Sequence, residues 1–278
     1  MMKNIFLFFF TALCSVLFAA DSLTTLSIEG TYSEGDFGTD YTTKAYYVPV
    51  VATYRQGRVH ASITVPYIKL DSEGSVTWTD GGVVPISPSK PSDVGVVPMN
   101  TNAFDPFAQP DDNTTATSTQ TSGLGDVILN AGYTFLHANK VLLKTSAIVK
   151  LATADENKGL GTGEHDYSAQ VDIITSYDQM YFGASAGYTI TGDTDIYKYN
   201  DVLYSSLVAG YNIRYGFHSG VSYYYRQALF DSVDDTHSVS PYLSYKMLDT
   251  LKVELRYTHG LSDSTADNAY TLKFIYKL

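Results

Sequence analysis

The sequence of 278 residues is poor in thiols, in basic side chains and in long apolar runs. Its one cysteine, Cys14, lies in the apolar N-terminal segment, so the rest of the chain has no disulfide, no cysteine nucleophile and no cysteine-ligated metal. Acidic residues outnumber basic ones by 29 to 18, and the net charge of −11 argues against nucleic-acid binding. After residue 20 no apolar run is long enough for a membrane-spanning helix, which leaves a membrane β-barrel open.

The first twenty residues have the layout of a secretory signal peptide. Lys3 precedes an apolar stretch that begins at Ile5 and ends at Ala19 and Ala20, directly before Asp21. We therefore expect a signal peptide over residues 1–20 and a mature domain over 21–278. A retained N-terminal anchor helix is the alternative.

What the sequence has in abundance is alternation of apolar and polar residues, together with 24 tyrosines and 21 glycines. This period of two predicts β-strands with one apolar and one polar face. At the end of the chain the apolar set is Tyr270, Leu272, Phe274, Tyr276 and Leu278. We expect twelve strands, at about 23–33, 44–55, 58–69, 125–136, 140–152, 166–177, 180–191, 202–214, 216–227, 237–248, 251–261 and 269–278.

The connections between these strands alternate strictly between short and long. The short ones fall at residues 56–57, 137–139, 178–179, 215 and 249–250, and the long ones at about 34–43, 70–124, 153–165, 192–201, 228–236 and 262–268. Short periplasmic turns and long extracellular loops give this alternation in an outer-membrane barrel. We therefore predict an all-β fold, a single transmembrane antiparallel β-barrel of about 12 strands. A secreted β-sandwich shares the local pattern but would not show the alternation.

The segment 70–124 is the longest connection and holds six of the nine prolines. Within it, residues 76–79 and 83–84 flank Asp80-Gly81-Gly82 and predict a small hairpin above the membrane. The apolar pieces 94–99 and 104–107 could fold over or into the mouth of the barrel. A flexible surface loop is the alternative for the whole segment.

Placing the apolar residues outward puts charged side chains on the inner face. The expected lumen-lining residues are Arg55, Asp126, Lys144, Lys150, Asp172, Arg214, Arg226, Lys246, Lys252, Glu254, Arg256 and Lys273, and Glu29, His60, His218 and Lys277 share their face. This set holds ten basic and four acidic side chains, which predicts a pore that favours anionic solutes. Alternatively the interior charges neutralise one another, for instance Glu254 with Lys252 or Arg256.

Catalytic and metal-binding patterns are weak in this sequence. The six histidines are scattered without HExxH or a paired metal spacing, so we expect no catalytic residue, no metal site and no cofactor. Asp231, Asp234 and Asp235 could hold a divalent ion, but solvation of a loop explains them as well. Since outer-membrane phospholipases are also twelve-stranded barrels, a barrel hydrolase acting on lipid stays an alternative.

Glycine-rich motifs in the middle of the chain resemble those of a known family. They are Gly123-Leu124-Gly125-Asp126, then Val149-Lys150-Leu151-Ala152-Thr153, and then Gly159-Leu160-Gly161-Thr162-Gly163. This pattern over about 120–180 resembles the transporter-like outer-membrane barrels labelled as components of the meta-pathway of phenol degradation. Ala152 stands where that pattern has proline. Membership would imply passage of small, aromatic solutes, whereas the glycines themselves suit a tight loop-to-strand junction and a flexible external turn.

The sequence thus predicts a passive channel for small solutes in the outer membrane of a Gram-negative cell, not an enzyme. The expected partners are outer-membrane lipid, the permeating solutes and the barrel-assembly machinery during biogenesis, with the oligomeric state left open. A barrel hydrolase and a structural or adhesive surface barrel remain the alternatives.

Overall fold

The computed structural model describes residues 23–79, 82–85, 119–138, 140–194 and 198–278. The expected signal peptide and the apolar pieces 94–99 and 104–107 lie outside these residues. No helix within the described residues is long and apolar enough to cross a membrane.

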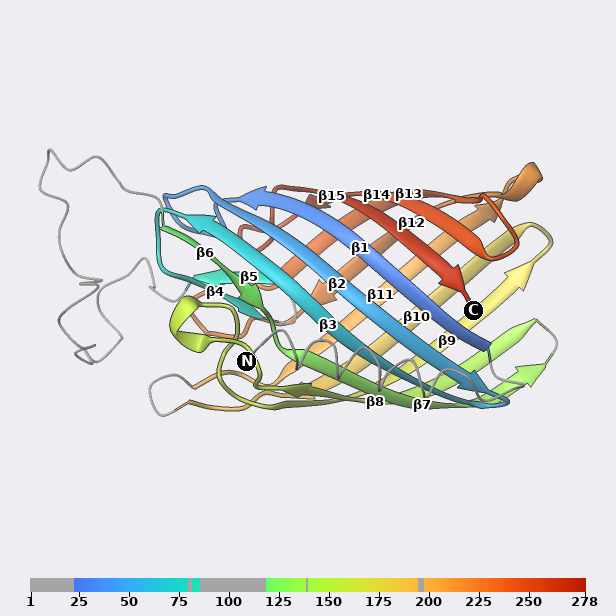
Figure 1. Cartoon of the computed structure of the whole chain (residues 1–278), viewed down its shortest axis with the longest axis horizontal. Coiled ribbons are helices and arrows are strands. Elements are labelled where there is room, and N and C mark those ends of the chain that lie inside the picture. Colours follow the sequence, from blue (N-terminus) through green and yellow to red (C-terminus); the bar gives the residue numbers. More distant parts are fainter. Residues whose placement is uncertain (1–22, 80–81, 86–118, 139, 195–197) are drawn as a thin grey trace, which may run out of the picture.

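Twelve long strands form the wall of a closed antiparallel barrel (Figure 1). They are β1 (Leu23–Gly35), β2 (Thr43–Gln56), β3 (Val59–Ser72), β6 (Thr119–Leu124) continued by β7 (Val127–Ala138), β8 (Val141–Leu151), β9 (Asp166–Tyr177), β10 (Met180–Ile190), β11 (Val202–Asn212), β12 (Phe217–Arg226), β13 (Thr236–Lys246), β14 (Leu251–Gly260) and β15 (Asn268–Lys277). Each strand pairs with its chain neighbours, and β1 pairs with β15, which closes the sheet. The prediction of a twelve-stranded all-β barrel is confirmed.

The two ends of the barrel differ in their connections. The short turns and the C-terminus lie at one end, and the long loops lie at the other (Figure 1). The turns are tight because single residues in them take left-handed backbone angles, such as Gly57 at φ 57° and Asp178 at φ 53°. We call these the short-turn end and the long-loop end.

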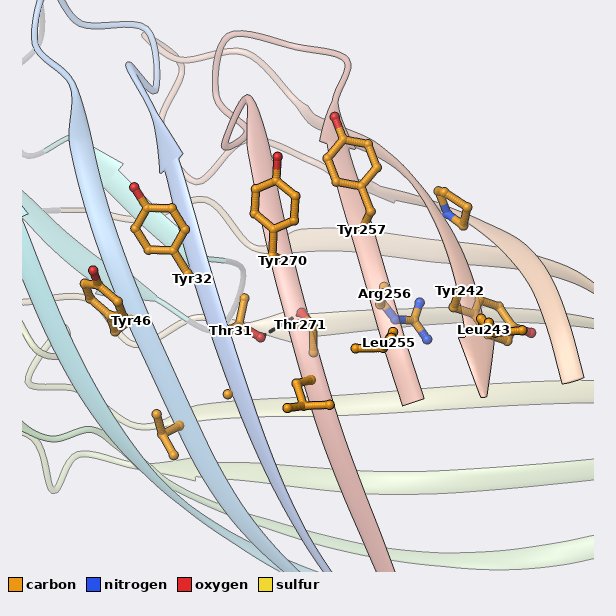
Figure 2. A pocket seen from close by; sticks show the side chains of 14 residues that line it. Thr31, Tyr32, Tyr46, Tyr242, Leu243, Leu255, Arg256, Tyr257, Tyr270 and Thr271 are labelled. Atoms are coloured by element: carbon orange, nitrogen blue, oxygen red, sulfur yellow. Dashed lines mark hydrogen bonds between the residues drawn. The ribbon is translucent and has the colours of Figure 1, made fainter. Parts of the chain in front are cut away.

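The outer face of the barrel is an apolar belt between two girdles of tyrosine. Exposed aliphatic and phenyl side chains such as Val171, Leu207 and Phe274 cover the middle. Figure 2 shows one girdle toward the long-loop end, where Tyr32, Tyr46, Tyr257 and Tyr270 lie on the adjacent strands β1, β2, β14 and β15. The other girdle, near the short-turn end, includes Tyr54, Tyr177, Tyr211, Tyr245 and Tyr276. This layered surface is the one that a barrel presents to a lipid bilayer.

The small hairpin forms as predicted, but it packs into the mouth of the barrel. β4 (Val76–Thr79) pairs with β5 (Gly82–Pro85). Val83 is buried against inward side chains of the wall, among them Ala45, Ile68 and Leu70, and Trp78 stacks on Tyr47 at 4.9 Å between ring centroids. Burial of apolar surface therefore holds the hairpin inside the long-loop end, packed against the inner wall, which the local sequence pattern did not show.

Some strand ends differ from those that the alternation predicts. The fourth wall strand begins with β6 at Thr119, inside the expected loop 70–124, because β6 pairs with the end of β3. The strand expected over 202–214 stops at Asn212, and the chain then makes the 3-10 turn η2 (Arg214–Gly216), in which Tyr215 takes a left-handed φ of 65°. Arg214 consequently lies exposed in a turn and not on a strand face.

Candidate functional site: the barrel interior

Residues that pair across neighbouring strands have their side chains on the same face of the sheet. The strand register therefore shows which residues share a face all the way around the barrel wall. One row runs from Tyr181 through Gly210, Gly220 and Tyr242 to Arg256, on five successive strands. Side chains on this face also meet across an intervening strand, as His60 of β3 does with Ser146 of β8 at 3.3 Å. Because it also packs against the hairpin in the mouth, this face is the interior of the barrel.

Most of the charged residues that the sequence singled out lie on the inward face and are paired. Lys144 contacts Asp172 at 3.3 Å, and Lys273 contacts Glu29 at 3.1 Å. Glu254 accepts from Arg256 at 2.8 Å and lies 3.6 Å from Lys252. These ion pairs neutralise part of the predicted surplus of basic charge. This agrees with the alternative that the interior charges neutralise one another.

Other residues that were expected to line the lumen lie near the two ends of the barrel. Arg55 is exposed near the short turns, and Lys246 forms an ion pair with Asp249 of a turn at 2.7 Å. This pair lowers the pKa of Asp249 from its usual value, mainly through the hydrogen bond from Lys246. Arg226 is buried at the long-loop end, where it donates to the hydroxyl of Thr79 on the hairpin at 3.4 Å.

The motif residues at the long-loop end meet in a buried ionic cluster. The Lys150 ammonium is 2.7 Å from Asp166 and 3.7 Å from Asp126, and it donates to Thr162 at 2.8 Å. Asp126 accepts in addition from the backbone N–H groups of Thr153 and its successor, both at 2.9 Å. We call Lys150, Asp126, Asp166 and Thr162 the Lys150 cluster. Such a fully partnered ion group fixes the loop after β8 in one conformation.

The glycine-rich run 159–163 is part of this packing and is not the flexible turn that the sequence suggested. Leu160 is only 1% exposed and belongs to the apolar core under the hairpin. The hairpin is also bonded to the run, because Trp78 donates its N–H to the Gly159 carbonyl at 2.8 Å and Thr77 donates to the Gly161 carbonyl at 3.2 Å. The family-like motifs therefore build the support that holds the hairpin in the mouth.

A cavity of about 600 Å³ lies on the inward face of strands β9 to β14. Its lining includes Tyr181, Ser206, His218, Ser222, Lys252 and Arg256. Tyr181 and Tyr242 cover it on one side, since their hydroxyls meet at 2.5 Å above Gly210 and Gly220. A Cβ at either glycine would overlap a tyrosine ring, so glycine is required for these rings to lie flat along the wall. We call this space the β9–β14 cavity.

A second hollow, of about 720 Å³, lies on the outer face below the tyrosines of Figure 2. Its walls are mostly apolar outward side chains, such as Val48, Leu255 and Leu272. In the bilayer this surface meets acyl chains and not water, so the hollow is no part of a path for polar solutes. Among the described residues, no group of three His, Cys, Asp or Glu is placed to hold a metal ion.

Sequence reasoning missed two sets of interior residues. Asp166, which forms the shortest ion pair of the Lys150 cluster, has the same strand parity as Asp172 and could have been found by counting back along β9. The inward tyrosines Tyr47, Tyr181 and Tyr242 follow from parity as well, but the abundance of tyrosine in girdles hid them.

A family model described as "Putative MetA-pathway of phenol degradation" matches residues 27–278. The structure is similar to an outer membrane channel from Pseudomonas putida F1, with a TM-score of 0.68 and 11% identity over 94% of this chain and 97% of that one. It is also similar to the NanC porin, with a TM-score of 0.56 and 12% identity over 91% and 100% of the two chains. The comparison with curated proteins finds no match. At these identities the structural likeness shows a shared barrel fold.

Proposed function

Since the chain belongs to the MetA-pathway of phenol degradation family and has the fold of outer-membrane channels, we propose that it passes small solutes through its interior and favours anions. In this proposal the short turns face the periplasm and the long loops face the outside, as in barrels with this alternation. The barrel binds and conducts but performs no chemistry.

The surplus of positive charge on the inward face carries the proposal. The basic residues on this face are Arg55, Lys144, Lys150, Arg226, Lys246, Lys252, Arg256, Lys273 and Lys277, and the acids are Glu29, Asp126, Asp166, Asp172 and Glu254. Among the residues that the structure describes, Arg55, Arg226 and Lys277 have no carboxylate within 4.0 Å. A low-dielectric wall concentrates the field of such charges on a solute inside it.

The alternative of a lipid hydrolase finds little support in the interior geometry. His60 and Ser146 are 3.3 Å apart, which is within reach of a base and its nucleophile. Both are buried on the inward face, and among the described residues no hydrogen bond from a ring nitrogen of His60 to a carboxylate is seen. A lipid substrate would meet the outer face instead.

Swelling of liposomes that contain the purified protein tests the proposal. We expect uptake of small solutes, with a small organic anion faster than a neutral solute of equal size, and exclusion of large oligosaccharides. In a variant with Arg55→Glu and Lys277→Glu the advantage of the anion should shrink, whereas Lys158→Glu, in an exposed loop pair, should leave it unchanged. Swelling no faster than that of protein-free liposomes would rule out the channel.

A further inference from the structure

The β9–β14 cavity has the size of a binding site for a small molecule. Its volume of about 600 Å³ lies within the range of ligand pockets, about 300–1,000 Å³. Nearly all of its lining comes from inward side chains of one half of the barrel, strands β9 to β14. A solute in this cavity would therefore contact this half of the wall.

Arg256 lines this cavity, and its side chain is fixed by several contacts. The Arg256 guanidinium donates to Ser222 at 3.0 Å and to Glu254 at 2.8 Å, and it lies over the Tyr242 ring at 4.9 Å. Lys252 shares the same carboxylate at 3.6 Å, so two cations of the lining face one anion, Glu254. The two cations and one carboxylate leave the lining with one surplus positive charge, which Arg256 and Lys252 share because both contact Glu254.

The rest of the lining includes three serine hydroxyls and the Asn212 amide, together with four tyrosines and the apolar side chains of Ile174 and Val208. Ser206 bonds to Ser185 at 2.7 Å, and Ser240 bonds to Thr258 at 2.8 Å. His218 and Asn212 form a further pair at 2.6 Å. Each hydroxyl has one donor and two acceptor positions, so these bonds leave capacity for a ligand. An apolar ring in the cavity would strip water from these groups without replacing its hydrogen bonds, which costs affinity.

We propose that the β9–β14 cavity binds small polyhydroxylated carboxylates, the chemistry of a sugar acid, as they pass through the barrel. The carboxylate meets the surplus charge of Arg256 and Lys252, and the hydroxyls of the solute meet Ser206, Ser222 and Ser240. A neutral sugar lacks the first contact, and an aryl carboxylate lacks the second. The inference rests on the proposed channel function for passage, but binding itself does not require conduction.

Current block in planar bilayers tests the specificity. Glucuronate added to the chloride electrolyte should interrupt the current at a several-fold lower concentration than benzoate or glucose. Ser206→Ala and Arg256→Gln should each raise the half-blocking concentration about threefold to tenfold, the loss expected for a hydrogen bond or more. Ser62→Ala, on the inward face of β3 outside the lining, should not change it.

Calorimetric titration of glucuronate into the detergent-solubilised protein gives a readout that is independent of conduction. Heat of binding that is weakened by Ser206→Ala supports the site even if no current is seen, in which case only the channel function fails. Chloride current with equal block by glucuronate, benzoate and glucose would overturn the site while leaving the channel. Preferential block by benzoate would replace the sugar acid with an aryl acid and would equally refute the proposal.

Discussion

At the scale of single residues, Lys150 holds the long-loop end together. It is 3% exposed and contacts two carboxylates, so removal of its charge leaves Asp126 and Asp166 buried side by side without a cation. We predict that Lys150→Met lowers the free energy of unfolding in lipid vesicles by about 3–5 kcal/mol. Lys158→Met breaks an exposed pair with Asp155 and should cost less than about 1 kcal/mol. Similar losses in the two variants would show that the Lys150 cluster is not buried as described.

Gly161 gives a second test of the same region. A Cβ there would lie 2.6 Å from the Asp126 carboxylate and 2.7 Å from the Ala154 side chain. We predict that Gly161→Ala destabilises the barrel by about 1–3 kcal/mol, measured by denaturant unfolding in vesicles. Gly30→Ala on the outer face, where a Cβ meets no atom within 4 Å, should change the stability by less than about 0.5 kcal/mol. A neutral Gly161→Ala would mean that residues 159–163 are as mobile as the sequence suggested.

At the scale of elements, strand β15 separates the lipid face from the interior. Phe274 is 41% exposed on the outer face, and its neighbour Lys273 pairs with Glu29 inside. Phe274→Arg places a charge against the bilayer and should cost about 2–4 kcal/mol near the midplane. We predict a sharply reduced yield of assembled barrel for this variant, measured by heat-modifiable gel mobility, and a near-normal yield for Lys273→Gln. Equal yields would mean that the two faces are assigned the wrong way round.

The sequence predicts an element well where local periodicity determines its position, and poorly where long-range contacts do. Alternation finds β15 and most other wall strands to within a few residues, because one face of each must be apolar. It misses β6 (Thr119–Leu124), which pairs with β3 inside the segment expected to be a loop. Alternation gives the wrong position for Arg214. The strand ends before the turn at Tyr215, so side chains beyond that point no longer alternate between the two faces. Alternation cannot show that Trp78 stacks on Tyr47, a contact between a loop hairpin and a wall strand. The packing of hairpin and loops depends on such long-range burial.

At the scale of the whole molecule, acidic residues gather at one end and basic residues at the other. The long loops carry acids such as Asp155, Glu164 and Asp234, whereas Arg58, Lys140 and Lys246 lie at or beside the short turns. Chemical labelling of introduced cysteines can show which end of the barrel faces the outside of the cell. We predict that cysteines at residues 158 and 234 (Lys158→Cys, Asp234→Cys) react with an impermeant maleimide on intact cells. A cysteine introduced by Thr250→Cys in a short turn should react only after lysis, and labelling of it from outside would invert the topology.

We propose that the barrel conducts through its interior and that the surplus positive charge there favours anions. The reversal potential of the purified protein in a planar bilayer under a gradient of potassium chloride tests it most directly. We predict discrete channel openings and a reversal potential shifted toward the equilibrium potential of chloride, with the shift weakening at high salt as the charges are screened. A reversal potential on the potassium side, or the absence of channel openings from folded protein, would contradict the account.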